Sequence, residues 1–369
     1  MMKAILLAGG RGTRLRPLTH TSNKHALLIA NKPLIMYPFE SILEAGIKDI
    51  AVIINETGDE IKAILGDGSK WGVKITYIFQ ERPLGLAQPI NLAEKFIGKS
   101  KFIVVLGDNM LQKSIKNEVA IFEKSDLNGH VLGVKVPVLD HPRFGVATIN
   151  KNGYIVRYIE KPGVVDKSKL YNPQMSYAIT GFYFFDANVV KCFYGKDKIQ
   201  PSSRGELEIA APYNWLLKHG YNKITLSEVK GWWKDPGKPE DVLAANKLVL
   251  DWKRDFKNQG IIINSIINGQ VEIMSGSQVS NSEIQGPVSI GKNSIIKDSF
   301  IGSYSAIGKN CKIVGVHVQN SIIMGDAHIY NVKSRLENCM IGWSTEITEQ
   351  NEEPKSSSLF IGDHSIVKL

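Results

Sequence analysis

A chain of 369 residues, 43% hydrophobic and 22% charged, has the composition of an ordinary globular protein, and its length favours two domains. No apolar run approaches the roughly 18 residues of a membrane-spanning helix, and the short apolar start has no signal-cleavage site. The formal charge of +9 comes from scattered lysines without interleaved aromatics, which makes nucleic-acid binding the weakest interpretation and fits anionic small substrates.

The cysteines bear on metal binding and on compartment. Cys192, Cys311 and Cys339 lie far apart in the sequence and lack the spacing of a metal site. We therefore expect reduced packing residues in a cytoplasmic protein.

Short apolar runs alternate with amphipathic stretches from Lys3 to about Leu250. We expect strands at 3–8, 49–54, 74–79 and 101–106, helices at 38–45, 58–65 and 89–96, and further strands at 129–136, 145–149, 155–159 and 180–185. This alternation predicts right-handed crossovers and an α/β, Rossmann-like, mostly parallel sheet with helices on both faces. The unbroken apolar run Phe102–Leu106 fits a strand that is buried on both faces.

The pattern changes after the charged, amphipathic stretch 241–257. Aliphatic residues then recur at every fifth or sixth position, at Ile290, Ile296, Ile301, Ile307 and Ile313, and glycine often follows. This period predicts a hexapeptide solenoid, the left-handed parallel β-helix, whose coils bury a core only when stacked. A β-sandwich with frequent glycine turns is the alternative. We expect domain boundaries at 1–250 and 251–369.

The first apolar strand is followed by a glycine-rich segment. Residues 7–19 read Leu-Ala-Gly-Gly-Arg-Gly-Thr-Arg-Leu-Arg-Pro-Leu-Thr. Glycines let the backbone approach phosphates, consecutive amides form an anion-binding nest, and Arg14 adds a forked cation. The segment is neither a P-loop nor a complete dinucleotide fingerprint. A simple tight turn is the alternative, which the two arginines and the downstream Lys24 make weaker.

Gly-Gly-x-Gly-Thr-Arg-Leu-x-Pro-Leu-Thr, then Lys24 and Asn31-Lys32-Pro33, resembles the signature of hexose-1-phosphate nucleotidyltransferases. Over essentially its whole length the chain is similar to long-form glucose-1-phosphate thymidylyltransferases, which carry a C-terminal solenoid. The resemblance implies that residues 1–250 are catalytic and transfer dTMP from dTTP to glucose 1-phosphate, giving dTDP-glucose and pyrophosphate. An in-line attack of the sugar phosphate on the α-phosphorus needs positioning and charge neutralisation rather than a protein nucleophile.

The resemblance also implies the site residues. The nucleotide-binding set is Ala8, Gly9, Gly10, Gly12, Thr13, Gln80 and Gly85, in which Gln80 reads the pyrimidine edge. The sugar-phosphate set is Asn109, Gly145, Glu160, Lys161 and Arg204. Arg14, Lys24 and Lys161 are the expected catalytic cations, and Asp108 and Asp235 the expected ligands of a Mg²⁺ cofactor. Pro236 stands where the family has threonine, which puts the geometry at Asp235 in question.

Three alternatives stay open. The same scaffold is similar to enzymes that use UTP or other nucleoside triphosphates. An acetyltransferase solenoid would need a catalytic histidine, for which His317, His328 and His364 are available. A non-catalytic regulatory subunit of the same fold is the third, and it would usually lack the loop arginine or the metal aspartates.

We expect the solenoid to assemble a homo-oligomer, so that truncation near residue 250 weakens assembly more than chemistry.

Overall fold

The computed structural model describes residues 1–162, 172–349 and 359–368. The chain packs as two compact units, the first made of Met1–Gly10 and Ile35–Lys234, and the second of Arg11–Leu34 and Asp235–Leu369. The glycine-rich segment thus leaves the first unit after Gly10 and packs with the C-terminal part of the chain. The boundary expected at 250/251 stays a prediction.

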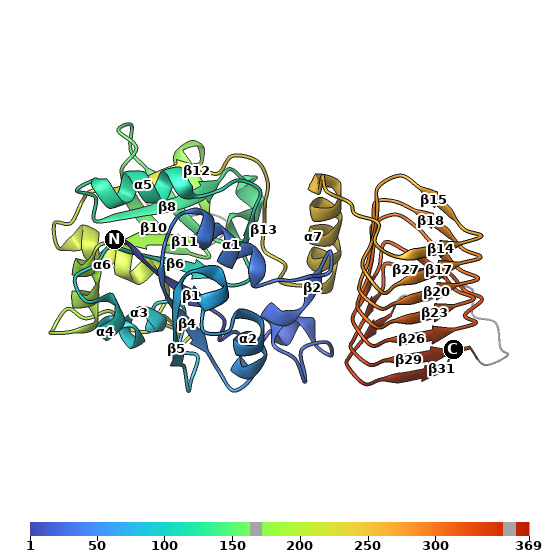
Figure 1. The fold of residues 1–369 in the computed structure, drawn as a ribbon. Coiled ribbons are helices and arrows are strands. Elements are labelled where there is room, and N and C mark those ends of the chain that lie inside the picture. The colour runs from blue at the N-terminus through green and yellow to red at the C-terminus, as the bar shows by residue number, and fades with distance from the viewer. Residues whose placement is uncertain (163–171, 350–358, 369) are drawn as a thin grey trace. The chain divides into compact units, whose positions relative to one another are not determined.

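A nine-stranded sheet forms the centre of the first unit (Figure 1). Its strands are β1 (Lys3–Leu7), β4 (Asp49–Ile54), β5 (Lys74–Phe79), β6 (Phe102–Leu106), β8 (Gly129–Val134), β9 (Gly145–Ile149), β10 (Ile155–Glu160), β11 (Ser176–Phe185) and β12 (Ile224–Glu228). The order is β10-β9-β11-β6-β1-β4-β5, and β8 pairs with β11 and β12. The four adjacent strands β6, β1, β4 and β5 run parallel to one another, whereas β11 runs antiparallel to its neighbours β6, β8 and β9. The predicted Rossmann-like sheet is confirmed as a mixed one.

Helices cover both faces of this sheet. They are α1 (Met36–Glu44), α2 (Gly58–Leu65), α3 (Gln88–Leu92), α4 (Glu94–Ile97), α5 (Lys116–Lys124) and α6 (Ala210–Lys218). Successive β1 side chains point to opposite faces, so Ile5 packs in one apolar cluster with Ile90, while Leu6 packs in the other with Phe39. The single helix expected at 89–96 is interrupted at Ala93, whose ψ of 7° lies outside the helical range.

Short elements complete the first unit. They are β7 (Met110–Leu111), β13 (Trp233–Lys234) and 3₁₀ turns at Ser69–Trp71, Val138–Arg143, Pro173–Met175 and Ala187–Phe193. Strands β7 and β13 form an antiparallel pair. This pair brings the segment before Asp235 close to the chain that follows β6.

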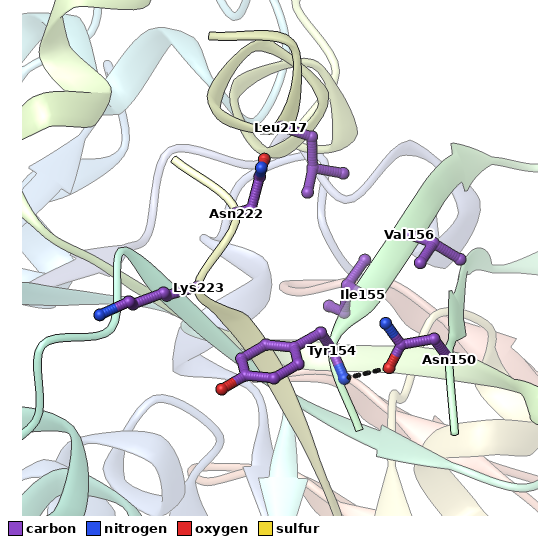
Figure 2. A pocket seen from close by; sticks show the side chains of 7 residues that line it. All are labelled: Asn150, Tyr154, Ile155, Val156, Leu217, Asn222 and Lys223. Atoms are coloured by element: carbon purple, nitrogen blue, oxygen red, sulfur yellow. Dashed lines mark hydrogen bonds between the residues drawn. The ribbon is translucent and has the colours of Figure 1, made fainter. Parts of the chain in front are cut away.

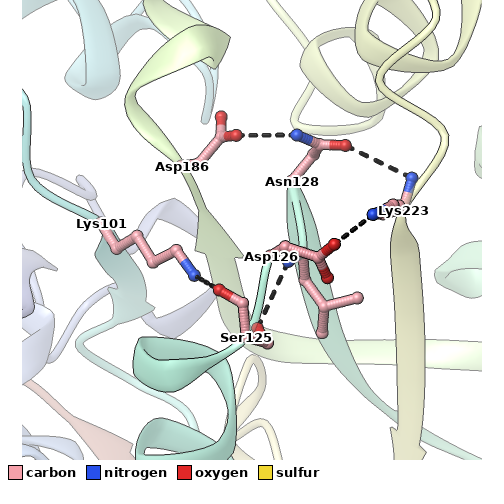
Figure 3. Close-up of polar contacts among 7 residues, drawn as sticks. Lys101, Ser125, Asp126, Asn128, Asp186 and Lys223 are labelled. Atoms are coloured by element: carbon pink, nitrogen blue, oxygen red, sulfur yellow. Dashed lines mark hydrogen bonds and ion pairs between the residues drawn. The ribbon is translucent and has the colours of Figure 1, made fainter.

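A group of charged residues supports the end of α5 (Figure 3). Lys101 Nζ donates hydrogen bonds to the carbonyl oxygens of Phe122, at 2.7 Å, and of Ser125. A cation at this position satisfies the last helix carbonyls. Burial lowers the pKa of Lys101, and the charge of Asp186 opposes this shift. Lys101 therefore caps the end of α5, and we assign this group of residues no part in substrate binding.

The second unit contains a solenoid of three parallel sheets. One sheet consists of β14 (Ile261–Ile263), β17 (Gln278–Ser280), β20 (Ile295–Lys297), β23 (Lys312–Val314), β26 (His328–Tyr330), β29 (Glu346–Thr348) and β31 (Ile366–Lys368). The second consists of β15 (Ile266–Asn268), β18 (Glu283–Gln285), β21 (Phe300–Ile301), β24 (His317–Gln319) and β27 (Leu336–Glu337). The third consists of β16 (Val271–Ile273), β19 (Val288–Ile290), β22 (Ser305–Ile307), β25 (Ile322–Ile323), β28 (Met340–Ile341) and β30 (Phe360–Ile361).

Stacked coils bury the aliphatic residues that revealed the repeat. Val279, Ile296 and Ile313 occupy equivalent positions in successive coils, and each is fully buried. A full coil takes 17 residues in the regular part, the sequence separation of the bond from Ser294 N to Ser277 Oγ. The predicted left-handed β-helix is confirmed.

Helix α7 (Pro239–Trp252) and the glycine-rich segment complete the second unit. The segment holds only the 3₁₀ turns η1 (Thr13–Leu15) and η2 (Lys24–Ala26) and the short strands β2 (Leu28–Ile29) and β3 (Lys32–Pro33). Buried Asn246 of α7 accepts a hydrogen bond from Ala30 N and donates one to Tyr304 O, both at 2.8 Å. One helix side chain thus joins the segment to a solenoid coil.

The cysteines agree with their expected role. Cys192, Cys311 and Cys339 are buried and form no disulfide. Burial raises the pKa of both Cys192 and Cys311 to about 12, so their thiols stay protonated and unreactive. Among the described residues, no helix is long and apolar enough to cross a membrane.

Candidate active site

Three predicted nucleotide-binding residues of the first unit, Ala8, Gly9 and Gln80, lie together at the end of β1. Ala8 N donates to Ile53 O at 2.8 Å, and Gly9 O accepts from Asn55 Nδ2 at 3.1 Å. The side chain of Gln80 lies against Gly9, since a Cβ built on that glycine would stand 2.5 Å from Gln80 Oε1. The structure therefore places Gln80 beside the glycine turn.

Gln88 fixes the orientation of the Gln80 side chain. Gln80 is buried and donates from Nε2 to Gln88 Oε1 at 2.8 Å, and the same oxygen accepts from Leu84 N at 2.9 Å. An amide held on one side presents a fixed donor or acceptor on the other, as base recognition requires. Sequence reasoning missed Gln88, because its partner lies eight residues away across a loop.

The backbone conformation and the close neighbours of residue 85 require glycine at this position. Its φ is +111°, and an added Cβ would stand 2.5 Å from both the N and O atoms of Leu207. Leu207 pairs with this loop through Leu207 N to Leu84 O, at 2.7 Å, and Ala87 N to Leu207 O, at 2.9 Å. Close packing against Leu207 thus explains the glycine without a ligand, and its predicted contact with the base remains a prediction.

Asp108 follows β6, at the carboxyl end of the parallel strands. Asn109 is buried and donates from Nδ2 to Asp108 Oδ1 at 2.8 Å. Asn109 Oδ1 in turn accepts from Trp233 Nε1 at 2.8 Å. Asn109 therefore orients the Asp108 carboxylate, and Trp233 orients Asn109. Sequence reasoning missed Trp233, because its partner lies 124 residues away.

A further cluster, which we call the sugar-side cluster, consists of Gly145, Glu160, Lys161, Arg204 and Glu208. Gly145 pairs with Glu160 across β9 and β10, and a Cβ on the glycine would stand 2.8 Å from Glu160 Oε2. Arg204 forms an ion pair with Glu208 at 2.7 Å. Burial raises the pKa of Glu160, as does the charge of Glu208, while Lys161 and Arg204 oppose the shift.

Arg14 and Asp235 both belong to the second unit. Exposed Arg14 lies against Gly237, where an added Cβ would stand 3.0 Å from Nη2. Gly237 N donates to Asp235 O at 2.9 Å, which closes a three-residue turn centred on Pro236. The fixed φ of proline suits the inverse γ-turn, so Pro236 is compatible with an ordered Asp235.

Lys24 lies beside Gly12, in the same unit. It is buried, and a Cβ on Gly12, whose φ is +60°, would stand 2.9 Å from Lys24 Cβ. Thr19 Oγ1 donates to Gly12 O at 2.7 Å, and Asn23 Oδ1 caps the turn by accepting from His25 N at 2.9 Å. Lys24 therefore sits within an ordered turn.

The predicted site residues fall into four groups. In the first unit they are Ala8, Gly9 and Gln80; Asp108 and Asn109; and Gly145, Glu160, Lys161 and Arg204, while Gly85, also of this unit, packs against the Leu207 backbone. In the second unit they are Gly12, Thr13, Arg14, Lys24 and Asp235, while Gly10 ends the first. Asp108 and Asp235 thus belong to different units. Within the described ranges, no three His, Cys, Asp or Glu side chains form a metal cluster.

A pocket of about 490 Å³ lies elsewhere in the first unit (Figure 2). It is lined by Asn150, Tyr154, Ile155, Val156, Leu217, Asn222 and Lys223. None of these is a predicted site residue, and the Lys223 ammonium forms an ion pair with Asp126. We assign this pocket no role.

The packing of Gly85 gives a stability prediction. Gly85→Ala introduces both a strained φ and a clash with the Leu207 backbone, whereas Gly153→Ala has a φ of +80° with nothing within 4 Å. We expect a loss of about 1–2 kcal/mol in Gly153→Ala and about 1–3 kcal/mol more in Gly85→Ala. Urea unfolding followed by circular dichroism measures both, and equal midpoints would contradict the assigned contact.

Comparison with known proteins bears on the identity of this site. Residues 3–251 match the family model described as nucleotidyl transferase. The chain is 40% identical to the low-salt glycan biosynthesis nucleotidyltransferase Agl11 of Haloferax volcanii, over 100% of both chains. It is 36% identical to a glucose-1-phosphate thymidylyltransferase of Streptomyces griseus, over 100% of this chain and 99% of the relative.

A solved structure supports the same assignment. The crystal structure of a Bacillus anthracis protein assigned as a glucose-1-phosphate thymidylyltransferase, solved with sucrose, is 36% identical and has a TM-score of 0.60. The match covers 70% of this chain and 98% of that one. The chain therefore belongs to the nucleotidyl transferase family and is an enzyme of the glucose-1-phosphate thymidylyltransferase type, in the long form with a C-terminal solenoid.

Proposed function

We propose that this enzyme transfers dTMP from dTTP to glucose 1-phosphate and releases pyrophosphate. The sugar-side cluster is the observation that carries this proposal. It combines a largely desolvated carboxylate, Glu160, with the cations Lys161 and Arg204, next to a residue without a side chain. Carboxylates bind sugar hydroxyls and cations bind a phosphate ester, so the cluster suits a hexose 1-phosphate.

The nucleotide would bind at the glycine turn. Its phosphates suit the cations Arg14 and Lys24, and its base suits the oriented amide of Gln80. A phosphate oxygen of the sugar attacks the α-phosphorus, a new P–O bond forms, and the bond to the bridging oxygen breaks as pyrophosphate leaves. No protein base is needed, because the sugar phosphate is already an anion. The cations bring two anionic substrates together and neutralise charge that develops on the transferred group.

The donors available fit magnesium as the cofactor. Asp108 and Asp235 offer carboxylate oxygens, which this hard cation prefers, and Mg²⁺ commonly completes its shell with phosphate oxygens and water. When bound, it would supply further neutralisation of the triphosphate charge. Asn109 would then act on the metal site by fixing the Asp108 carboxylate through its 2.8 Å bond.

Pyrophosphate release tests the proposed substrates. The enzyme is incubated with Mg²⁺, glucose 1-phosphate and, in parallel, dTTP or each of the four common ribonucleoside triphosphates. We expect fast release with dTTP, or with dTTP and UTP, because the Gln80 amide recognises the edge that the two bases share.

Other outcomes identify the alternatives. Release with ATP or GTP alone would contradict the assignment of a pyrimidine nucleotide but would still support nucleotidyl transfer. Silence with every nucleotide, also with mannose 1-phosphate and N-acetylglucosamine 1-phosphate, would favour a regulatory subunit.

The metal assignment predicts the effect of two substitutions. Asp108→Asn and Asp235→Asn should each lower magnesium-dependent turnover by about 100-fold or more, because metal ligation stabilises the transition state by several kcal/mol. Asp59→Asn changes an exposed carboxylate on α2 and serves as the control. Steady-state kinetics and circular dichroism check activity and folding together. Near-normal turnover in either active-site variant would refute that residue's role.

A further inference from the structure

The segment Arg11–Leu34, which we call the signature loop, has little regular structure to hold it in place. Its helical turns have three residues each and its strands two. Such a segment cannot order itself by backbone hydrogen bonds alone, because fixing each residue costs about 1–2 kcal/mol. Neighbouring parts of the second unit must therefore supply the order.

Asp363, in the last described coil of the solenoid, hydrogen-bonds directly to this loop. Its Oδ2 atom accepts from Thr21 Oγ1 at 2.9 Å and from Ser22 Oγ at 2.5 Å. Its Oδ1 atom accepts from Trp343 N at 2.8 Å, which ties the carboxylate to the preceding coil. A carboxylate that accepts three hydrogen bonds holds its donors strongly and in a defined direction, so Asp363 can fix this part of the loop against the coil.

Comparison of Asp363 with the equivalent positions of other coils indicates that its carboxylate is needed for the contact with the loop and not for the coil itself. Strand pairing aligns Ile361 with Ile341 and with the equivalent residues of earlier coils. Two residues further on, the stacked positions hold Asp363, Trp343, Gly325, Lys309 and Lys292. The other four positions fold without an acid, so the repeat itself does not require one.

The loop contacts the solenoid at a second place. Asn31 Nδ2 donates to Ser289 O at 3.0 Å and to Ser289 Oγ at 2.9 Å. The main-chain neighbour of Asn31, Ala30, is held by Asn246 of α7. The loop is therefore fixed to solenoid coils on both sides of η2, the turn that carries Lys24.

We propose that Asp363 is a positioning residue for nucleotide binding, which holds the signature loop so that Lys24 and Arg14 are placed for the triphosphate. The proposal rests on the proposed function. Ser22 lies two residues from Lys24, and Thr19 bonds to the carbonyl of Gly12, two residues before Arg14. The solenoid is then part of the catalytic apparatus, in addition to any role in assembly.

Kinetics of matched variants test this role. Asp363→Ala removes the acceptor from the solenoid side, and the double variant Thr21→Val, Ser22→Ala removes the donors from the loop side without altering a coil. Both should raise KM for the nucleotide about tenfold and leave KM for the sugar phosphate unchanged, because the sugar-side cluster belongs to the other unit. Combining all three changes should add little. Asp298→Asn removes the charge of an exposed solenoid carboxylate at a φ of 48°, which asparagine also adopts; it is the control and should resemble the unmodified enzyme.

A second measurement keeps this inference separate from the proposed function. In hydrogen–deuterium exchange, amides of residues 18–24 should exchange faster in both variants than in the unmodified chain, whatever the substrate proves to be. Unchanged exchange would overturn the positioning role. So would an equal rise in both KM values, or a kinetic effect in Asp363→Ala that the loop-side variant does not share.

Discussion

The proposed function depends on one physical constraint: a polar, glycine-rich loop must be rigid enough to place cations against a triphosphate. Glycines permit the close backbone approach that phosphates need, and they also raise the conformational entropy that ordering must overcome. Here the order comes from hydrogen bonds to other parts of the second unit, at Asn246, Ser289 and Asp363. This arrangement also changes the expected effect of truncation near residue 250, since two of these three partners lie beyond it.

Local sequence patterns predicted most of the elements. The runs at 49–54, 58–65 and 74–79 match β4, α2 and β5, and the aliphatic period identified the solenoid, because burial imposes a fixed repeat on these side chains. The antiparallel direction of β11 was not predictable, since an apolar run carries no information about its partner. Membership of Arg11–Leu34 in the second unit was equally hidden, because it depends on contacts more than 200 residues apart in sequence.

The candidate site, too, contains contacts that local sequence patterns did not reveal. The motif residues expected to bind the substrates stay predictions, and the residues that orient two of them were not identified from the sequence. Trp233 and Gln88 act through single hydrogen bonds to Asn109 and Gln80, which no spacing rule reveals. Close packing against the Leu207 backbone accounts for the glycine at position 85, so its expected contact with the base stays a prediction.

The most direct test of this account is hydrogen–deuterium exchange of the unmodified enzyme with and without dTTP and Mg²⁺. If the signature loop binds the triphosphate, amides of residues 9–24 should become protected on addition of nucleotide, while amides in the solenoid coils around Ile296 and Ile313 stay unchanged. Protection that is absent from the loop, or confined to other segments, would contradict the assignment of the nucleotide site.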